Sequence, residues 1–133
     1  VIEGCDYFCT YCVVPYTRGR QISRAPQSIV QEVRTLAKAG FREITLLGQT
    51  VDSYGRDFTD RHYRFDQLLH DVSAVPGIDR IRFMTSHPLD LTPQIMQAIA
   101  DLPNVMEFVH IPMQAGDDDI LARMRRGYTA QQY

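Results

Sequence analysis

Several residue types are scarce in this chain of 133 residues, and their scarcity limits the classes of protein to which it can belong. Tryptophan is absent and Lys38 is the only lysine, so nearly all of the positive charge is arginine. The formal net charge is −2, whereas a self-sufficient nucleic-acid-binding domain usually has a basic surface. Any large RNA substrate is therefore expected to be bound partly by segments outside this chain.

Long apolar segments are also missing. No run of about 18 consecutive apolar residues occurs, so the sequence predicts no membrane-spanning helix. The first residues do not resemble a secretory signal peptide, because Cys5 and Asp6 stand where its apolar segment would have to lie. We therefore expect a cytoplasmic protein with no membrane partner.

Cysteine is confined to one short segment. Cys5, Cys9 and Cys12 are the only cysteines of the chain. An odd, clustered set without a secretion signal indicates metal binding rather than a disulfide framework.

Strand-like and helix-like segments alternate along the chain, which predicts an α/β fold with parallel strands. The pattern fits a flavodoxin-like open sheet or part of a (β/α) barrel. The chain starts almost inside its first strand and ends directly after a helix, so we expect a piece of a longer protein. The predicted strands are 1–3, 43–47, 80–85 and 105–111, the predicted helices are 25–40, 65–75, 93–101 and 117–125, and residues 50–64 are predicted to form a surface loop.

The three cysteines have the spacing C-x3-C-x2-C. Three thiolates on a tight loop can bind three irons of a [4Fe–4S] cluster, because thiolate is the usual ligand of such iron. The fourth iron then has no cysteine, and an open coordination position is typical of catalytic metal sites. Ferredoxin-type electron carriers use four cysteines instead. The motif therefore favours reactive chemistry over simple electron transfer.

A zinc site is the alternative interpretation of the same cysteines. His87 and His110 both lie at predicted strand ends, and either could supply a fourth ligand. Zinc motifs usually contain two closely spaced pairs of ligands, which this spacing does not match well. This alternative corresponds to a zinc-stabilised binding module without catalysis.

The cysteine motif, with an aromatic residue before its last cysteine, resembles the signature of radical S-adenosylmethionine (SAM) enzymes. Other segments are similar to the tRNA methylthiotransferases of that superfamily, and they are spread over the whole chain. Thr50 and Ala115 depart from the Asn and Ser that are common in that family. The similar segments are VVPYTRGR at 13–20, LLGQTVDSYG at 46–55, TSHP at 85–88, HIPMQAG at 110–116 and RGYT at 126–129.

This resemblance implies a partial (β/α)6, TIM-like barrel, cut to about its first four β/α units, with residues 1–133 as the radical SAM core domain. An N-terminal domain with a second [4Fe–4S] cluster and a C-terminal RNA-binding module would be absent from this segment. The cofactors implied are the [4Fe–4S] cluster on the three cysteines and SAM. The partners implied are tRNA and an electron donor such as flavodoxin or ferredoxin.

The implied reaction adds a methylthio group to C2 of N6-isopentenyladenosine next to the tRNA anticodon. SAM would serve both as methyl donor and as the source of a 5′-deoxyadenosyl radical. A sibling methylthiotransferase acting on threonylcarbamoyladenosine in tRNA, or on a ribosomal protein, is the nearest alternative.

Beyond the cysteines, the resemblance and the predicted strand ends indicate several SAM-binding residues. Tyr11 is expected near the adenine of SAM. Gly48 and Gln49 end a predicted strand, and the carboxyl ends of barrel strands carry the active site. Ser86 and Gln114 follow later strands and could bind SAM or the substrate by hydrogen bonds.

The arginines of the chain fall into two groups. Arg18 and Arg20 follow the cysteine motif and could pair with the carboxylate of SAM or with RNA phosphate. The side chains of Arg123, Arg125 and Arg126 are expected to cap the last helix.

Overall fold

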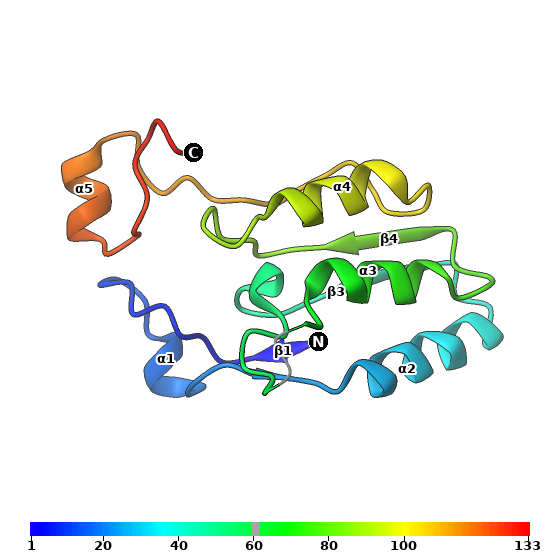
Figure 1. The fold of residues 1–133 in the computed structure, drawn as a ribbon. Helices are drawn as coiled ribbons and strands as arrows, with labels where there is room; N and C mark the ends of the chain where they lie inside the picture. The colour runs from blue at the N-terminus through cyan, green and yellow to red at the C-terminus, as the bar shows by residue number, and fades with distance from the viewer. Residues whose placement is uncertain (60–61) are drawn as a thin grey trace.

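A parallel pair of strands forms the centre of the fold in this computed structural model, which describes residues 1–59 and 62–133 (Figure 1). Strand β3 (Glu43–Leu46) runs beside β4 (Arg80–Phe83), with Ile44 opposite Ile81 and Leu46 opposite Phe83. These four side chains are buried, and the residues between them are more exposed. Alternation of this kind is expected of a sheet with one face in the core.

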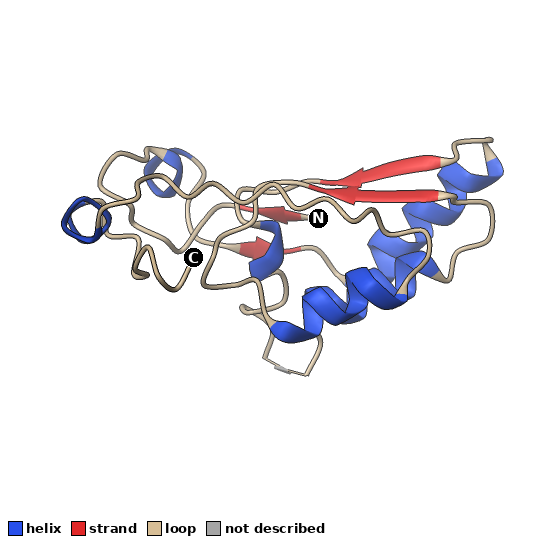
Figure 2. Cartoon of the chain, turned by 90° about the horizontal axis from the view of Figure 1, so that it is seen from above, coloured by secondary structure: helices blue, strands red, loops and turns tan. Residues whose placement is uncertain are grey.

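Three helices pack side by side against this pair of strands. Helix α2 (Pro26–Lys38) contacts α3 (Phe65–Ser73), and α3 contacts α4 (Pro93–Asp101). Figure 2 shows them on the same side of the β3–β4 ladder. Each helix buries one apolar stripe in the common core. The helices begin and end close to their predicted bounds.

The first strand pairs differently from the prediction. Strand β1 (Ile2–Glu3) pairs antiparallel with β2 (Ile22–Ser23), a strand that the sequence did not predict. The amino group of Val1 nevertheless donates a hydrogen bond of 2.8 Å to the carbonyl of Leu47. This bond places β1 beside the end of β3, so the segment that follows β1 starts next to the carboxyl ends of the central strands.

The predicted strand 105–111 is wrong. Within the described residues it contributes only one isolated parallel bridge, between Val105 and Ile81. The amide of Phe108 donates to the carbonyl of Met106, two residues earlier. A turn this tight interrupts regular pairing, and Phe108 is 54% exposed.

The predicted surface loop 50–64 is wrong in its first part. Residues 50–54 are buried and include the 3-10 helix η1 (Val51–Ser53). Tyr54 is fully buried, and its hydroxyl donates to the carbonyl of Arg24 at 2.6 Å. The polar residues of this segment can be buried because they are hydrogen-bonded, as Ser53 is to the Thr50 carbonyl. Residues 60 and 61 of this predicted loop lie outside the described residues.

Two short helices flank the carboxyl ends of the central strands. Helix α1 (Val14–Thr17) was not predicted, whereas α5 (Asp118–Arg123) confirms the predicted last helix. The described residues thus form an α/β fold with two separate two-stranded sheets and no closed barrel. No helix among them is both long and apolar enough to cross a bilayer.

Gly48 lies where β1 approaches the end of β3, and this contact can be tested. A Cβ at this position would lie 2.1 Å from Cγ2 of Ile2. We expect Gly48→Ala to lower the free energy of unfolding by about 1–3 kcal/mol, as overpacking does, measured by urea unfolding. Gly116→Ala is the control, because its nearest contact would be 4.0 Å away. The double variant with Gly48→Ala and Ile2→Ala should lose less free energy of unfolding than the two single variants together. Losses that add up fully would contradict this contact.

Candidate functional site

A cavity of about 190 Å³ lies between the cysteine loop and the carboxyl ends of β3 and β4. Most of the residues predicted from the sequence to form the site meet there, although they come from four separate segments of the chain. The predicted residues that line the cavity are Cys5, Cys9, Tyr11, Cys12, Gln49, Ser86 and Gln114.

The cysteine loop begins at a glycine whose conformation and close backbone contact strongly disfavour any side chain. Gly4 has a φ of +70°, and a Cβ there would lie 2.1 Å from the carbonyl oxygen of Arg20. This close approach lets the amide of Cys5 donate to the Gly19 carbonyl at 3.2 Å. The returning segment 19–20 therefore fixes the first cysteine of the loop.

Hydrogen-bond donors surround the sulfur atoms of two cysteines. The amide of Tyr7 donates to Sγ of Cys5 at 3.4 Å, and Oγ1 of Thr50 lies 3.4 Å from the same sulfur. The guanidinium of Arg126 donates to Sγ of Cys9 at 3.4 Å. Donors aimed at sulfur stabilise a thiolate, which is the form that binds metal.

The three cysteines do not converge on one point. Within residues 1–59 and 62–133, no group of three His, Cys, Asp or Glu residues is arranged to hold a single metal ion. Among these residues, the cysteines therefore do not form a preassembled zinc site with His87 or His110. Three cysteines that each bind a different corner of a [4Fe–4S] cube are not required to converge.

Three buried polar atoms at the cavity have no hydrogen-bond partner. They are Oε1 of Gln49, Oγ of Ser86 and Nε2 of His87, and all three residues line the cavity. Buried polar atoms without partners are rare in folded proteins, and each requires an explanation. A polar ligand in the cavity would satisfy all three.

The imidazole of His87 is held in a defined state. The amide of Leu89 donates to its Nδ1 at 3.2 Å, so the neutral ring has its proton on Nε2. Burial, together with the nearby charges of Arg126 and Arg56, lowers the pKa of His87 to about 4. The ring stacks on Tyr7 with centroids 4.0 Å apart. His87 thus presents an N–H donor to the cavity at neutral pH.

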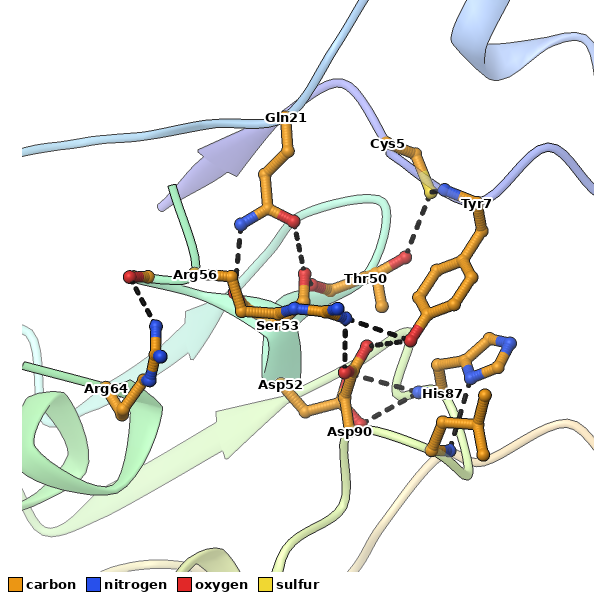
Figure 3. A network of polar contacts seen from close by, with 12 residues as sticks. Cys5, Tyr7, Gln21, Thr50, Asp52, Ser53, Arg56, Arg64, His87 and Asp90 are labelled. Carbon is orange, nitrogen blue, oxygen red and sulfur yellow. Dashed lines mark hydrogen bonds and ion pairs between the residues drawn. The ribbon is translucent and has the colours of Figure 1, made fainter. Parts of the chain in front are cut away.

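A polar network behind the cavity ties the cysteine loop to the loop after β4 (Figure 3). The Tyr7 hydroxyl donates to Asp90 at 2.9 Å, and Arg56 donates both to Asp90 at 2.7 Å and to the Tyr7 oxygen at 3.0 Å. Asp52 accepts the His87 amide on both carboxylate oxygens, at 2.8 and 3.0 Å. Burial raises the pKa of Asp52 to about 7.

Two residues at the cavity have unusual backbone conformations. Thr85 has a φ of +67° and Gln114 a φ of +72°. Such values are uncommon for non-glycine residues, above all for a β-branched one. The Thr85 hydroxyl donates to the Gly48 carbonyl at 2.5 Å, which joins the ends of β3 and β4. Strained backbone of this kind is concentrated at functional sites.

Three predicted site residues do not line the cavity. Gly48 packs against Ile2 at the back of the site. Arg18 is exposed, and Arg20 pairs with Asp6 at 2.9 Å on the surface. These two arginines are therefore exposed beside the cysteine loop and do not enter the cavity.

Other residues that line the cavity were missed or misassigned. Tyr7 and Thr50 also line the cavity but were not predicted as site residues, although an aromatic residue inside the C-x3-C spacing was a visible signal. The prediction that the Arg126 side chain caps the last helix is wrong. This side chain is only 5% exposed and points to Cys9.

Comparison with known proteins assigns the amino-acid sequence to a family. Residues 1–133 match the family model described as "Radical SAM superfamily". The chain belongs to the radical SAM superfamily. Its cofactors are accordingly a [4Fe–4S] cluster and SAM, as the cysteine motif and the resemblance predicted.

Several curated relatives of this radical SAM chain bear the name tRNA-2-methylthio-N(6)-dimethylallyladenosine synthase. Proteins of that name from Protochlamydia amoebophila and Thermoanaerobacter pseudethanolicus are each 53% identical to it over all 133 residues. One from Geobacter metallireducens is 52% identical over the same length. The chain spans only 28–30% of the length of these three relatives.

The residues present fit both cofactors of the radical SAM superfamily. Three cysteines on one loop supply the thiolates for the cluster, and no fourth cysteine exists in the chain to close the last iron. The unpartnered atoms of Gln49, Ser86 and His87 offer hydrogen bonds to a polar molecule beside it. Thiolate ligation with one open position is the donor set that the chemistry requires.

The raised pKa of Asp52 predicts a pH-dependent stability. From an ordinary value of 3.8, burial raises this pKa to about 7, so the folded protein keeps a proton that the unfolded chain releases. The free energy of unfolding of the wild type, relative to that of Asp52→Asn, should therefore fall as pH rises from about 4 to 7 and stay constant above. Urea unfolding at a series of pH values measures it. A difference that does not change with pH would contradict the burial of this carboxyl group.

Proposed function

We propose that this chain is the radical SAM core of a longer enzyme that adds a methylthio group to C2 of N6-isopentenyladenosine next to the tRNA anticodon. The observation that carries the proposal is about 52% identity, over every residue of the chain, to relatives named for that product. The chain covers less than a third of those relatives, so the activity is proposed for the complete protein.

We propose that the complete protein has two further parts. One is an N-terminal domain with a second [4Fe–4S] cluster, and the other is a C-terminal RNA-binding module. The net charge of −2 supports this division, because a segment with no net positive charge needs help to bind tRNA. In the complete protein the β3–β4 pair would extend into a partial (β/α)6 barrel. The three helices on one side of the ladder support a barrel over a doubly wound sheet (Figure 2).

Within this core, Cys5, Cys9 and Cys12 would bind the cluster, and the adjoining wall would bind SAM. When bound, the cluster supplies the electron that cleaves SAM and starts radical chemistry on the substrate. Ser86 and Gln49 would orient SAM through the hydrogen bonds that they lack in the protein alone. Gln114 and Tyr11 would lie against it on the open side of the cavity, where they line its wall.

The substrate and redox partners would approach from the side of the cysteine loop. Arg18 and Arg20 lie on the surface beside this loop, where a phosphate could be bound. A one-electron donor such as flavodoxin or ferredoxin would reduce the cluster. An enzyme of this kind, acting on tRNA, would work in the cytoplasm.

Loss of any one cysteine tests the proposed function. We expect Cys5→Ala, Cys9→Ala and Cys12→Ala in the complete protein to lose one of its iron–sulfur clusters after anaerobic reconstitution. Cells carrying these variants should lack the methylthio group on isopentenyladenosine, measured by mass spectrometry of tRNA nucleosides. Val13→Ala, which changes an exposed side chain directly after the third cysteine, is the control and should keep both properties. Normal modification in the cysteine variants would contradict the proposal, and a methylthio group missing from threonylcarbamoyladenosine instead would indicate a sibling enzyme.

The unpartnered atoms of the cavity predict which side chains bind SAM. We expect Gln49→Ala and Ser86→Ala each to weaken SAM binding about tenfold, since one hydrogen bond is worth roughly 1 kcal/mol or slightly more. Equilibrium dialysis of the anaerobically reconstituted protein measures the affinity. Gln97→Ala, on the exposed face of α4, should leave the affinity unchanged. If Gln49→Ala and Ser86→Ala bind SAM as tightly as the wild type with full iron content, this assignment is wrong.

A further inference from the structure

Arg126 is a buried cation without an anionic partner. Its side chain is 5% exposed, and no carboxylate pairs with it among the residues that the structure describes. Burying a charge is costly unless an opposite charge compensates it. The guanidinium lines the cavity and donates to Sγ of Cys9 at 3.4 Å. Among the described residues, the negative charge that compensates Arg126 must therefore come from the cysteine sulfur and from the ligand that the cysteine loop binds.

The backbone around Arg126 is built to aim it at the cysteine loop. Helix α5 ends in a reversal in which the amide of Arg126 donates to the Leu121 carbonyl and the amide of Arg125 to the Ala122 carbonyl, both at 3.0 Å. Arg125 takes the positive φ of 56° that such a reversal requires. The amide of Thr10 in turn donates to the Met124 carbonyl at 3.2 Å. The end of α5 and the cysteine loop are thus joined by a backbone hydrogen bond.

Tyr128 restricts the orientation of the Arg126 guanidinium group. Nε of Arg126 donates to the Tyr128 hydroxyl at 3.3 Å, and the guanidinium carbon lies 5.4 Å from the centre of the same ring. The Tyr128 hydroxyl donates to the Met113 carbonyl at 2.5 Å. A guanidinium group keeps its proton in proteins and has only hydrogen-bond donors to offer. Arg126 therefore remains charged beside Cys9.

We propose that Arg126 is a positioning residue that raises the reduction potential of the cluster by placing a fixed positive charge and a hydrogen bond on the Cys9 sulfur. Three thiolates give the assembled cluster a net negative charge. Reduction by a one-electron donor adds one electron and makes that charge larger, with no bond formed or broken. A nearby cation stabilises the reduced state more than the oxidised state, and hydrogen bonds to sulfur act in the same direction. The inference rests on the cluster binding proposed above.

The test is the midpoint potential of this cluster in the complete protein. It is measured by a redox titration in which the electron paramagnetic resonance signal reports the reduced cluster. We expect Arg126→Gln to have a lower potential than the wild type, because it removes the charge and keeps a polar side chain of similar shape. Arg126→Lys should fall between the two, since it keeps the charge without the planar group that reaches Cys9. Arg123→Gln is the matched control: it removes an exposed charge at the end of the same helix and should leave the potential unchanged.

Iron and sulfide content is measured first, which separates this inference from the proposed function. A wild-type protein whose cysteine loop binds no cluster would contradict the proposed function. A cluster present at full occupancy in Arg126→Gln with an unchanged potential would overturn the role of Arg126 alone. Weaker SAM binding together with an unchanged potential would also overturn it, and would assign the guanidinium to SAM. If Arg126→Gln retains no cluster, Arg126→Lys decides: a lower potential supports the role, and a potential at or above that of the wild type refutes it.

Discussion

The contact between Tyr7 and the loop after β4 is the interaction on which the geometry of this site depends. Tyr7 lies between the first two cysteines, stacks on His87 and donates to Asp90. A loop with three thiolates has few apolar side chains of its own to bury, so its shape must be imposed by its neighbours. Gly4 fixes one end through its close approach to Arg20, and the end of α5 fixes the other through Thr10. Without these three attachments the sulfur atoms would not be held on one side of a shared cavity.

The sequence predicted the residues of the site better than their surroundings. The cysteine spacing and the strand ends identified most residues that line the cavity, because the carboxyl ends of parallel strands meet at one edge. The sequence alone could not predict that Tyr7 stacks on a histidine 80 positions later or that Arg126 is buried against Cys9. Both contacts depend on the packing of segments that are distant in the chain. The failed strand 105–111 has the same origin. Its composition favours extension, and Met106 and His110 still form backbone hydrogen bonds with Ile81 and Ser86, but the turn at Phe108 interrupts the regular backbone that a continuous strand needs.

Charge has two separate roles in this molecule. On the surface several arginines lie beside carboxylates, as Arg20 does with Asp6, and such exposed pairs contribute little to stability. At the cavity the charged groups are buried and few, so each has a large effect on what can bind. The guanidinium of Arg126, the neutral imidazole of His87 and the unpartnered oxygens of Gln49 and Ser86 form a wall suited to an anionic cluster and a polar cofactor. Radical SAM chemistry requires these two ligands side by side.

The central claim is that three cysteines bind the cluster and leave one iron free to bind SAM directly. Electron–nuclear double resonance on the reduced, reconstituted protein, with SAM labelled in its amino and carboxylate groups, tests this claim most directly. We expect magnetic coupling between the cluster and both labelled groups, and we expect it to be lost when any of Cys5, Cys9 or Cys12 is replaced. Bound SAM with no coupling to the cluster would contradict it, because the fourth iron would then be closed to the cofactor.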